Sequence, residues 1–290
     1  MKHLQGRNVL VLGLGASGLA MARWCARHGA QVQVWDSREQ PPMLQALKQE
    51  WPQIPVLSGE LSTDILLDIH LLLKSPGLAP HDARVAPLLQ AARADRITVQ
   101  GELDLFQLAL DDLKTSMAYQ PAVLAITGTN GKTTTAALTA LLVQRCNRRV
   151  ALAGNIGPTL LDTLDAALDE LARAEAGADP LEQLPQVWVL ELSSFQLDAV
   201  QRFEPTAAVV LNITQDHLDW HGDMPSYVRS KSRIYGHEPI THEDGRIELS
   251  ETVMVINRDD ERVAAMEPAP IAVKGSRGKA ATTLSRHTLG

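Results

Sequence analysis

The chain has 290 residues, 45% hydrophobic content and a formal net charge of −7 at pH 7, so it is long enough for two domains with separate cores. The acidic balance argues against nucleic acid as a partner, and an anionic ligand must be met by local dipoles and a few basic side chains. Only Cys25 and Cys146 are present, without a Cys-x-x-Cys spacing, which argues against a disulfide framework or a zinc knuckle.

The N-terminal residues lead directly into a strand pattern, without the apolar core of a signal peptide. No segment reaches the roughly 18 uncharged residues that a membrane span needs. We therefore expect a cytoplasmic monomer that binds neither membrane nor nucleic acid.

The first predicted unit is a strand, a glycine-rich turn and a helix. A strand from Asn8 runs into Gly13-Leu-Gly15-Ala-Ser-Gly18, a helix continues to about His28, and a second strand ends at Asp36. The Gly-x-Gly-x-x-Gly spacing, followed about 20 residues later by an acid, is typical of a dinucleotide-binding βαβ unit. Taken alone, this unit predicts a nicotinamide-dependent oxidoreductase.

Further short apolar runs extend this first sheet, at 54–57, 69–73 and 97–99. They predict a Rossmann-like domain over residues 1–118, and the polar stretch 111–121 predicts a linker. The remaining residues, 119–290, again alternate apolar runs with helical patterns, with runs at 122–127, 150–153, 187–190, 207–213 and 253–256. The predicted fold class is therefore α/β in both domains, with ligands at the carboxyl ends of the strands.

The most specific motif opens the second domain. An apolar strand enters Gly128-Thr-Asn-Gly131-Lys132-Thr133-Thr134, which is shorter than the standard P-loop because Ile126 stands where that motif has a glycine. The glycines let backbone N–H groups approach an anion, the helix that follows presents its positive end, Lys132 adds a charge and the Thr133 hydroxyl can ligate magnesium. The motif predicts a site for a nucleoside triphosphate.

Polar residues follow the later strands, where a parallel sheet would gather them around this loop. Glu191 ends one strand and is interpreted as a magnesium ligand, the alternative being a helix-capping acid. The next strand leads into Asn212 and then Asp216-His217-Leu-Asp219-Trp-His221, which could hold a second cation. For His217, a metal or phosphate role and a purely structural role are equally open. Composition alone predicts that Lys231 is a solvated lysine on a basic helix.

Five motifs together resemble the central domain of the Mur ligase family, the enzymes that add amino acids to the peptidoglycan precursor. They are the ATP loop, Gly154-Asn155-Ile-Gly157, Glu191-Leu-Ser-Ser-Phe-Gln-Leu, Asn212-x-x-x-Asp216-His217 and Lys231-x-Arg-Ile-Tyr. The phenylalanine after the serine pair, the first glycine loop and the turn Ser75-Pro-Gly77 resemble the branch of the family that adds D-glutamate.

The resemblance implies an ATP-dependent carboxylate–amine ligase of peptidoglycan synthesis, and thus of cell-wall biogenesis, cell shape and cell division. The implied substrates are UDP-N-acetylmuramoyl-L-alanine and D-glutamate, and the implied cofactors are ATP and Mg²⁺ at two sites. The substrate carboxylate would attack the γ-phosphorus of ATP to give an acyl phosphate, and the D-glutamate amine would then form the amide and release phosphate.

The resemblance also implies roles for individual residues. The triphosphate would be cradled by Gly128, Thr129, Asn130, Gly131, Lys132, Thr133 and Thr134. One magnesium ion would be held by Thr133 and Glu191, and the second by His217 and by Lys231 in a carbamylated form, so that Lys132, Glu191, His217 and Lys231 form the catalytic set. The UDP substrate would contact Gly15, Ala16 and Ser17 with its diphosphate, Asp36, Ser37 and Arg38 on its uridine side, and Asn155, Ser193 and His217 at its sugar-peptide end. Gly77 would also line the pocket.

Members of this family continue into a third domain that completes the adenine pocket and receives D-glutamate, whereas this sequence stops at Gly290. We therefore expect a truncated chain that is inactive alone. Two alternatives stay open at this point: a nucleotide-binding module without turnover, and a nicotinamide-dependent oxidoreductase, which would leave the ATP loop unexplained.

Overall fold

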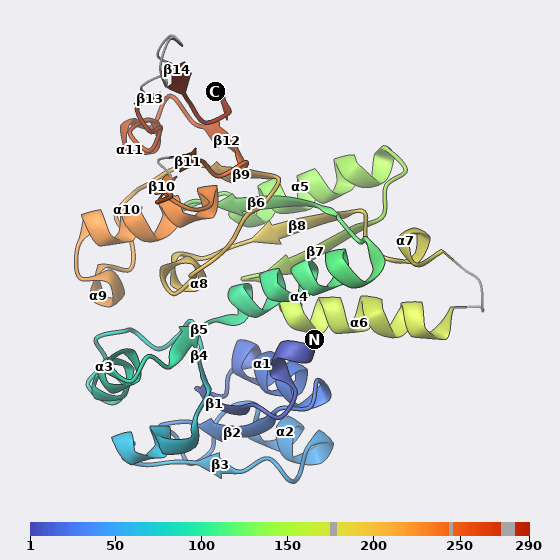
Figure 1. The fold of residues 1–290 in the computed structure, drawn as a ribbon, viewed down its shortest axis with the longest axis vertical. Helices are drawn as coiled ribbons and strands as arrows, with labels where there is room; N and C mark the ends of the chain where they lie inside the picture. Colours follow the sequence, from blue (N-terminus) through green and yellow to red (C-terminus); the bar gives the residue numbers. More distant parts are fainter. Residues whose placement is uncertain (175–178, 244–245, 274–281) are drawn as a thin grey trace. The chain divides into compact units, whose positions relative to one another are not determined.

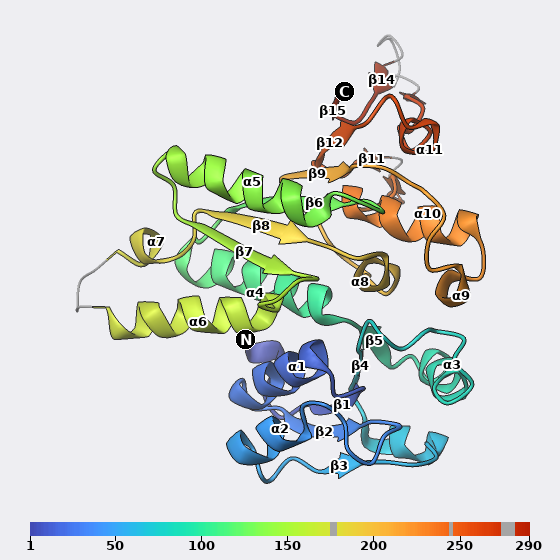
Figure 2. The same cartoon turned by 180° about the vertical axis from the view of Figure 1, so that it is seen from behind.

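The structure is a computed structural model, and it describes residues 1–174, 179–243, 246–273 and 282–290. The chain divides into two compact units, each described by itself below. Unit 1 comprises Met1–Gln120, Ala153–Pro185 and Ala199–Gln201, and unit 2 comprises Pro121–Leu152, Gln186–Asp198 and Arg202–Gly290. Both contain parallel sheets with helices, which confirms the predicted α/β class (Figures 1 and 2).

Unit 1 is built on a five-stranded sheet in the order β3-β2-β1-β4-β5, with every neighbouring pair parallel. The strands are β1 (Asn8–Leu12), β2 (Gln31–Trp35), β3 (Val56–Leu57), β4 (Leu71–Lys74) and β5 (Thr98–Gln100). The central strand β1 is buried from Val9 to Leu12. This agrees with its continuous apolar sequence, which is typical of a parallel strand covered on both faces. All five predicted strands of this sheet are present.

The helices of unit 1 cover this sheet and pack on one another. They are η1 (Lys2–Leu4), α1 (Ala16–Arg27), α2 (Leu44–Glu50), η2 (Thr63–Asp68), α3 (Ala86–Ala94), α4 (Glu102–Met117), α6 (Leu160–Arg173) and α7 (Pro180–Gln183). Helix α1 packs on β1 and β2, α3 packs on β5 and η2, and α6 packs on α1 and α4. Figure 1 shows α3 on one side of the unit and α1 with α2 on the other.

The predicted linker over 111–121 is wrong for its first part, because residues 111–117 form the last two turns of α4. The stretch is polar on one side only: Leu110 and Leu113 are buried and continue the apolar face that includes Phe106 and Ala109. The helix ends where Ala118 adopts a left-handed conformation with φ +58°.

Unit 2 is organised around a six-stranded sheet in the order β15-β12-β9-β6-β8-β7. Its strands are β6 (Ala122–Thr127), β7 (Val150–Gly154), β8 (Val187–Glu191), β9 (Ala207–Val210), β12 (Val253–Ile256) and β15 (Thr288–Leu289). Strand β9 is shorter than the apolar run 207–213 suggested. Its last bond to β6 is donated by the Leu211 N–H to the Thr127 carbonyl at 2.9 Å, and the next residue, Asn212, bonds to the loop that follows β6.

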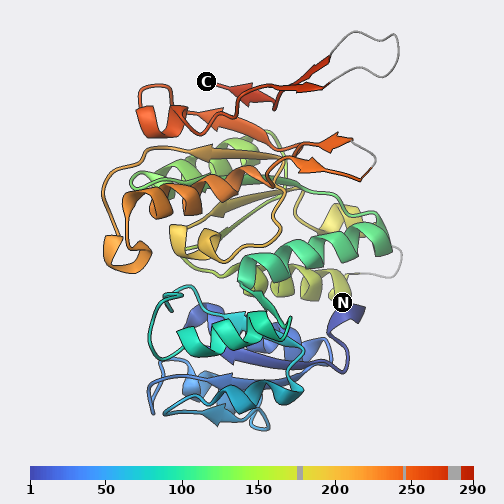
Figure 3. The ribbon, with the colours of Figure 1, turned by 60° about the vertical axis from the view of Figure 1, so that its left-hand side comes forward.

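The helices of unit 2 lie on both faces of this sheet. Helix α5 (Lys132–Arg145) packs on β6 and β8, and Figure 3 shows it behind the sheet with α10 (Met224–Ser232), in orange, in front. The remaining elements are α8 (Ser194–Asp198), α9 (Leu218–His221), η3 (Arg233–Tyr235), α11 (Glu261–Ala264) and the antiparallel pairs β10 (Ile240–Thr241) with β11 (Ile247–Glu248) and β13 (Ile271–Val273) with β14 (Thr282–Leu284). None of the helices in the described part of the chain is long and apolar enough to cross a membrane.

Candidate functional site

The turn between β6 and α5 needs its two glycines for different reasons. Gly131 has φ +82°, a conformation that costs a side-chain-bearing residue free energy, and it caps the first turn of α5 at Lys132. Gly128 lies so close to β9 that a Cβ atom there would come within 3.0 Å of the Leu211 Cβ atom. The loop is thus held against the end of β9, with the N-terminus of a 14-residue helix directly behind it.

Asn212 holds the loop in place. Its Oδ1 accepts the Asn130 N–H at 2.9 Å and its Nδ2 donates to the Asn130 carbonyl at 3.1 Å, while its backbone carbonyl accepts the Thr129 N–H at 2.9 Å. The sequence placed Asn212 in a motif but gave it no role. The available signal was its position immediately beyond a strand that neighbours the phosphate loop.

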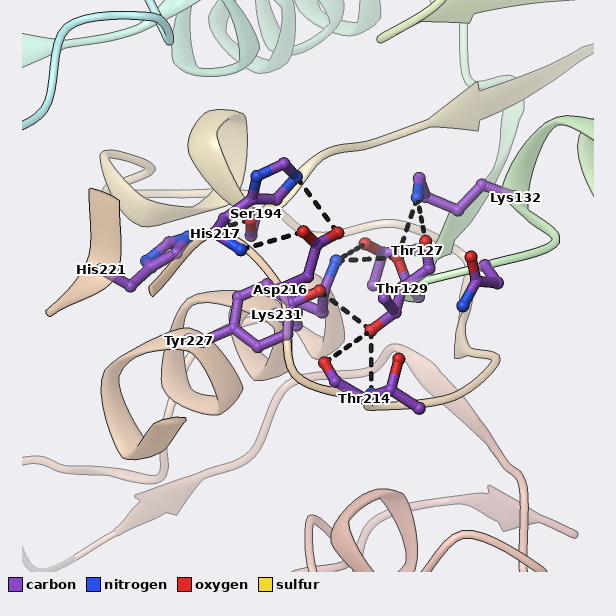
Figure 4. A network of polar contacts seen from close by, with 12 residues as sticks. Thr127, Thr129, Lys132, Ser194, Thr214, Asp216, His217, His221, Tyr227 and Lys231 are labelled. Atoms are coloured by element: carbon purple, nitrogen blue, oxygen red, sulfur yellow. Dashed lines mark hydrogen bonds and ion pairs between the residues drawn. The ribbon is translucent and has the colours of Figure 1, made fainter. Parts of the chain in front are cut away.

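The Thr129 hydroxyl joins the loop to two other segments (Figure 4). Its Oγ1 accepts the Thr214 N–H at 3.0 Å, donates to the Thr214 carbonyl at 3.2 Å, and lies 3.0 Å from the Tyr227 hydroxyl of α10. Sequence reasoning did not identify Tyr227 as part of the site. A tyrosine four residues before Lys231 on a helix lies on the same face as the lysine, and this spacing was the signal that could have found it.

Two lysines converge on the loop. Lys132 Nζ donates to the carbonyls of Gly128 at 3.0 Å and Thr129 at 2.8 Å, and Lys231 Nζ donates to the same Gly128 carbonyl at 2.9 Å and to Thr127 Oγ1 at 3.3 Å (Figure 4). Lys231 is only 2% exposed, so the composition-based prediction of a solvated lysine is wrong. Burial and, to a smaller extent, the positive charge of Lys132 lower the pKa of Lys231 to about 7, while Asp216 opposes the shift.

The proposed magnesium ligands lie around the same sheet edge. Glu191 is the last residue of β8, is buried, and pairs in register with Ile126, two residues before the loop. Thr133 and Thr134 are exposed in the first turn of α5. In the described ranges, no three His, Cys, Asp or Glu side chains surround a common point. A magnesium ion at a nucleotide site generally takes only one or two protein carboxylates and completes its shell with phosphate oxygens and water, so hard oxygen donors at this edge fit it.

His217 adopts a left-handed conformation with φ +51°, and its Nε2 lies 3.3 Å from Asp216 Oδ2. Its ring packs on Phe195 with the centroids 4.6 Å apart. The ammonium group of Lys231 cannot ligate a cation in the form found here, because it is itself a donor; a carbamylated side chain would present oxygen atoms instead. The imidazole of His217 is partly exposed, so it is accessible to a cation or to a substrate group.

The serine pair after β8 has two separate functions. Ser193 accepts the Gln196 N–H and donates its own hydroxyl to Gln196 Oε1 at 3.0 Å, which caps α8. Ser194 is buried, and its hydroxyl lies 2.9 Å from His221 Nε2. The sequence showed that His217 and His221 are close in the chain but did not predict this contact. The Ser230 hydroxyl donates to Asp198 at 2.8 Å, so α8 is tied to α10, the helix that carries Lys231.

The glycine turn of unit 1 is packed more tightly. Gly13 has φ +88° and its carbonyl accepts the Ser75 hydroxyl at 2.9 Å, while a Cβ atom on Gly18 would lie 1.9 Å from that carbonyl oxygen. This close approach keeps α1 on β1, and it leaves Gly15, Ala16 and Ser17 at the start of a 12-residue helix. Gly77 is exposed in the turn after β4, and Asn155 is exposed after β7.

Asp36 is already engaged within the protein. Its Oδ2 accepts the Leu14 N–H at 2.7 Å, and Arg38 binds the carboxylate through Nε and Nη2, both at 2.8 Å. Burial raises the pKa of Asp36, but Arg38 and the Leu14 N–H outweigh it and lower the pKa to about 2. A ribose diol, the usual partner of this acid in dinucleotide folds, would have to displace Arg38. Asp36 therefore fixes the glycine turn and Arg38, and Ser37 and Arg38 remain more accessible to a ligand.

Comparison with known proteins bears on both units. The model of the Mur ligase middle domain matches residues 126–287, and the model of the Mur ligase MurD-like N-terminal domain matches residues 7–101. The UDP-N-acetylmuramoylalanine–D-glutamate ligase of Albidiferax ferrireducens is 52% identical over 279 residues, which cover 96% of this chain and 50% of that protein. The ligase of the same name from Paraburkholderia xenovorans is 51% identical over 261 residues, covering 90% and 47%.

Among solved structures, a murein peptide ligase from Psychrobacter arcticus is similar with a TM-score of 0.47 and 16% identity, covering 90% of this chain and 51% of that one. The chain spans about half the length of the curated relatives it matches.

Proposed function

The chain belongs to the Mur ligase family, and from this premise we propose that it carries the UDP-substrate-binding and ATP-binding parts of a UDP-N-acetylmuramoylalanine–D-glutamate ligase. The observation that carries the proposal is the convergence of Lys132 and Lys231 on the Gly128 carbonyl of a loop braced by Asn212. Such an enzyme acts on soluble nucleotide-linked precursors, so we propose a cytoplasmic location.

In this proposal the loop Gly128–Thr134 binds the triphosphate of ATP. Its backbone N–H groups and the N-terminus of α5 meet the phosphate oxygens, and Lys132 moves from the loop carbonyls to the γ-phosphoryl group. The carboxylate of UDP-N-acetylmuramoyl-L-alanine attacks the γ-phosphorus, ADP leaves, and the D-glutamate amine then displaces phosphate from the acyl phosphate. The protein contributes position and charge neutralisation in this reaction.

Thr133 and Glu191 are the residues we propose to hold one magnesium ion, and His217 with carbamylated Lys231 the second. Bound magnesium would neutralise charge that develops on the phosphoryl oxygens. Lys231 is suited to carbamylation by its environment: it is buried, it packs 4.9 Å from the Tyr227 ring centroid, and its amine lies beside a second cation, Lys132, which disfavours the charged form.

For the UDP substrate we propose the residues around the glycine turn of unit 1. Gly15, Ala16 and Ser17 would meet the diphosphate, Ser37 and Arg38 would meet the uridine side, and Gly77 would also line the pocket. Asp36 would hold the glycine turn through the Leu14 N–H and would hold the Arg38 side chain directly. Asn155, Ser193 and His217 would contact the sugar-peptide end. By sequence, residues 1–118 form the UDP-binding domain of this proposal and residues 119–290 the ATP-binding domain.

Calorimetric titration of the chain with UDP-N-acetylmuramoyl-L-alanine and, separately, with NADH tests this function. We expect the UDP compound to bind and NADH not to bind, because the Asp36 carboxylate is occupied by Arg38. Binding of NADH alone would refute the ligase proposal and restore the oxidoreductase alternative. Ligation itself is then measured with a protein as long as the curated relatives, as release of phosphate from ATP that depends on D-glutamate.

A further inference from the structure

Unit 1 contains two Asp-x-Arg segments with the same internal hydrogen bonds. In Asp36-Ser37-Arg38, Asp36 Oδ1 accepts the backbone N–H of Arg38 at 3.0 Å and its Nε at 2.8 Å, and Oδ2 accepts Nη2 at 2.8 Å. In Asp82-Ala-Arg84, Asp82 Oδ1 accepts the backbone N–H of Arg84 at 3.0 Å and its Nε at 2.9 Å, and Oδ2 accepts Nη2. Each carboxylate thus locks one guanidinium group in place.

The two segments follow the two strands that flank β1 in the sheet. Asp36 directly follows β2, and Asp82–Arg84 lies between β4 and α3, while β1 between them leads into the glycine turn. Both guanidinium groups are accessible, with Arg38 54% and Arg84 57% exposed. Asp36 raises the pKa of Arg38 and the charge of Arg84 opposes it, so the two guanidinium groups are near enough to interact.

One hydrogen bond connects the segments. Arg84 Nη1 donates to Ser37 Oγ at 2.9 Å. A serine hydroxyl has one proton and two lone pairs, and a guanidinium group can only donate. Since one lone pair of Ser37 is taken by Arg84, its proton is free to be donated to a ligand atom, and the favoured ligand atom is an acceptor.

We propose that Arg84 is a specificity-determining residue: it holds Ser37 as a hydrogen-bond donor to a carbonyl oxygen of the uracil ring. This inference rests on the proposed function, which puts the uridine end of the substrate at Ser37. Uracil presents an acceptor at O4 where cytosine presents an amino donor. The arrangement of Arg84 and Ser37 therefore favours uridine over cytidine nucleotides, and nothing in the motifs around Gly13–Gly18 supplies that discrimination.

Titration of the 290-residue chain with UDP and with CDP tests the inference, with Arg84→Ala, Ser37→Ala and the double variant compared with wild type. We expect Arg84→Ala to lower the affinity for UDP about five- to tenfold, which corresponds to the loss of about one hydrogen bond. The affinity for CDP should fall less, so the ratio of the UDP affinity to the CDP affinity should fall. Because both residues act through one hydroxyl, the double variant should lose no more than Ser37→Ala alone.

Arg93→Ala, which removes an exposed arginine of α3, is the matched control and should bind both nucleotides as wild type does. An unchanged UDP-to-CDP ratio in Arg84→Ala, or effects of the two single variants that simply add, would overturn the role of Arg84 while leaving the ligase function intact. If wild type bound neither UDP nor UDP-N-acetylmuramoyl-L-alanine, the proposed function itself would fail. A thermal melt shows whether Arg84→Ala remains folded.

Discussion

The two glycine turns follow the same strand-to-helix plan, yet they use their glycines and charges differently. In unit 1 the turn after β1 is closed by contact: Gly18 lies against the Gly13 carbonyl, Ser75 bonds that carbonyl, and Asp36 holds the Leu14 N–H. In unit 2 the turn after β6 is close to Leu211 at Gly128 but open at Gly131, and it is braced by Asn212, with Lys132 and Lys231 on its carbonyls. In the proposed function, amides and arginines at the first turn would meet a diphosphate, and lysines at the second turn would meet a triphosphate.

The largest expected effect is a loss of stability that depends on how tightly each turn is packed around its glycine. Gly18→Ala should lower the free energy of unfolding by more than about 3 kcal/mol, because its Cβ atom would lie 1.9 Å from a backbone oxygen that cannot move without disturbing β1. Gly131→Ala is the matched change in unit 2, where the nearest atom to a Cβ is 3.7 Å away and only the φ of +82° resists, and it should cost about 1 kcal/mol. Denaturant titration measures both. Equal losses in the two variants would show that the turns do not differ in this way.

A second contrast concerns a carboxyl group buried beside the first turn. Glu102 begins α4, is 2% exposed, and accepts the Leu161 N–H of α6 at 3.0 Å through Oε1, while its Oε2 has no hydrogen-bond partner in the described structure. Burial raises the pKa of Glu102 to about 7, against the opposing effect of the Leu161 N–H and Ser17. The folded protein therefore keeps a proton on Glu102 at pH values where the unfolded chain has lost it.

The sign of the pH dependence follows. Between the ordinary pKa of 4.5 and the folded value of about 7, the folded state binds more protons, so stability from this group is present below pH 4.5 and lost as the pH rises to 7. About 2.5 pH units correspond to about 3 kcal/mol. Glu102→Gln keeps an acceptor for Leu161 and should be the more stable protein at pH 8, by up to this amount, with the difference vanishing near pH 4. Glu60→Gln, on the exposed surface of unit 1, is the control in the same denaturant series. A difference independent of pH would contradict the burial argument.

The contrast between the turns also shows how far sequence reasoning reaches. Strands β1 to β9 and β12, the two glycine motifs and the residues that follow β1, β6, β8 and β9 are predicted by the sequence, because periodicity and turn chemistry depend on neighbouring residues. The short strands β10, β11, β13, β14 and β15, of two or three residues each, are not predicted. The burial of Lys231 was not predictable from its basic helix, because it depends on α10 facing the phosphate loop. The occupation of Asp36 by Arg38 likewise depends on a side-chain conformation that spacing does not specify.

Tertiary packing accounts for the other misses. The polar stretch 111–117 became helix because Leu113 is buried, and residues 153–185 pack with unit 1 although they follow strands of unit 2 in the chain. The Asn212 bonds to Asn130 and the Thr129 contact with Tyr227 join residues that lie between 82 and 98 positions apart. Such contacts become visible only when the strands have been placed side by side.

A third prediction sharpens the comparison of the two turns by charge. Lys132→Met should weaken MgATP binding to the chain about 30-fold, about 2 kcal/mol, because the loop loses the charge-assisted bond that Lys132 can make to a phosphate oxygen. It should leave UDP-N-acetylmuramoyl-L-alanine binding unchanged, since the turn of unit 1 contains no lysine from Gly13 to Gly18. Arg145→Met removes a positive charge from the other end of α5 and is the matched control. Calorimetry with each ligand measures these effects. Loss of both ligands in Lys132→Met would mean that the substitution unfolds the chain or that the two turns are not chemically distinct, and a thermal melt of the variant separates these explanations.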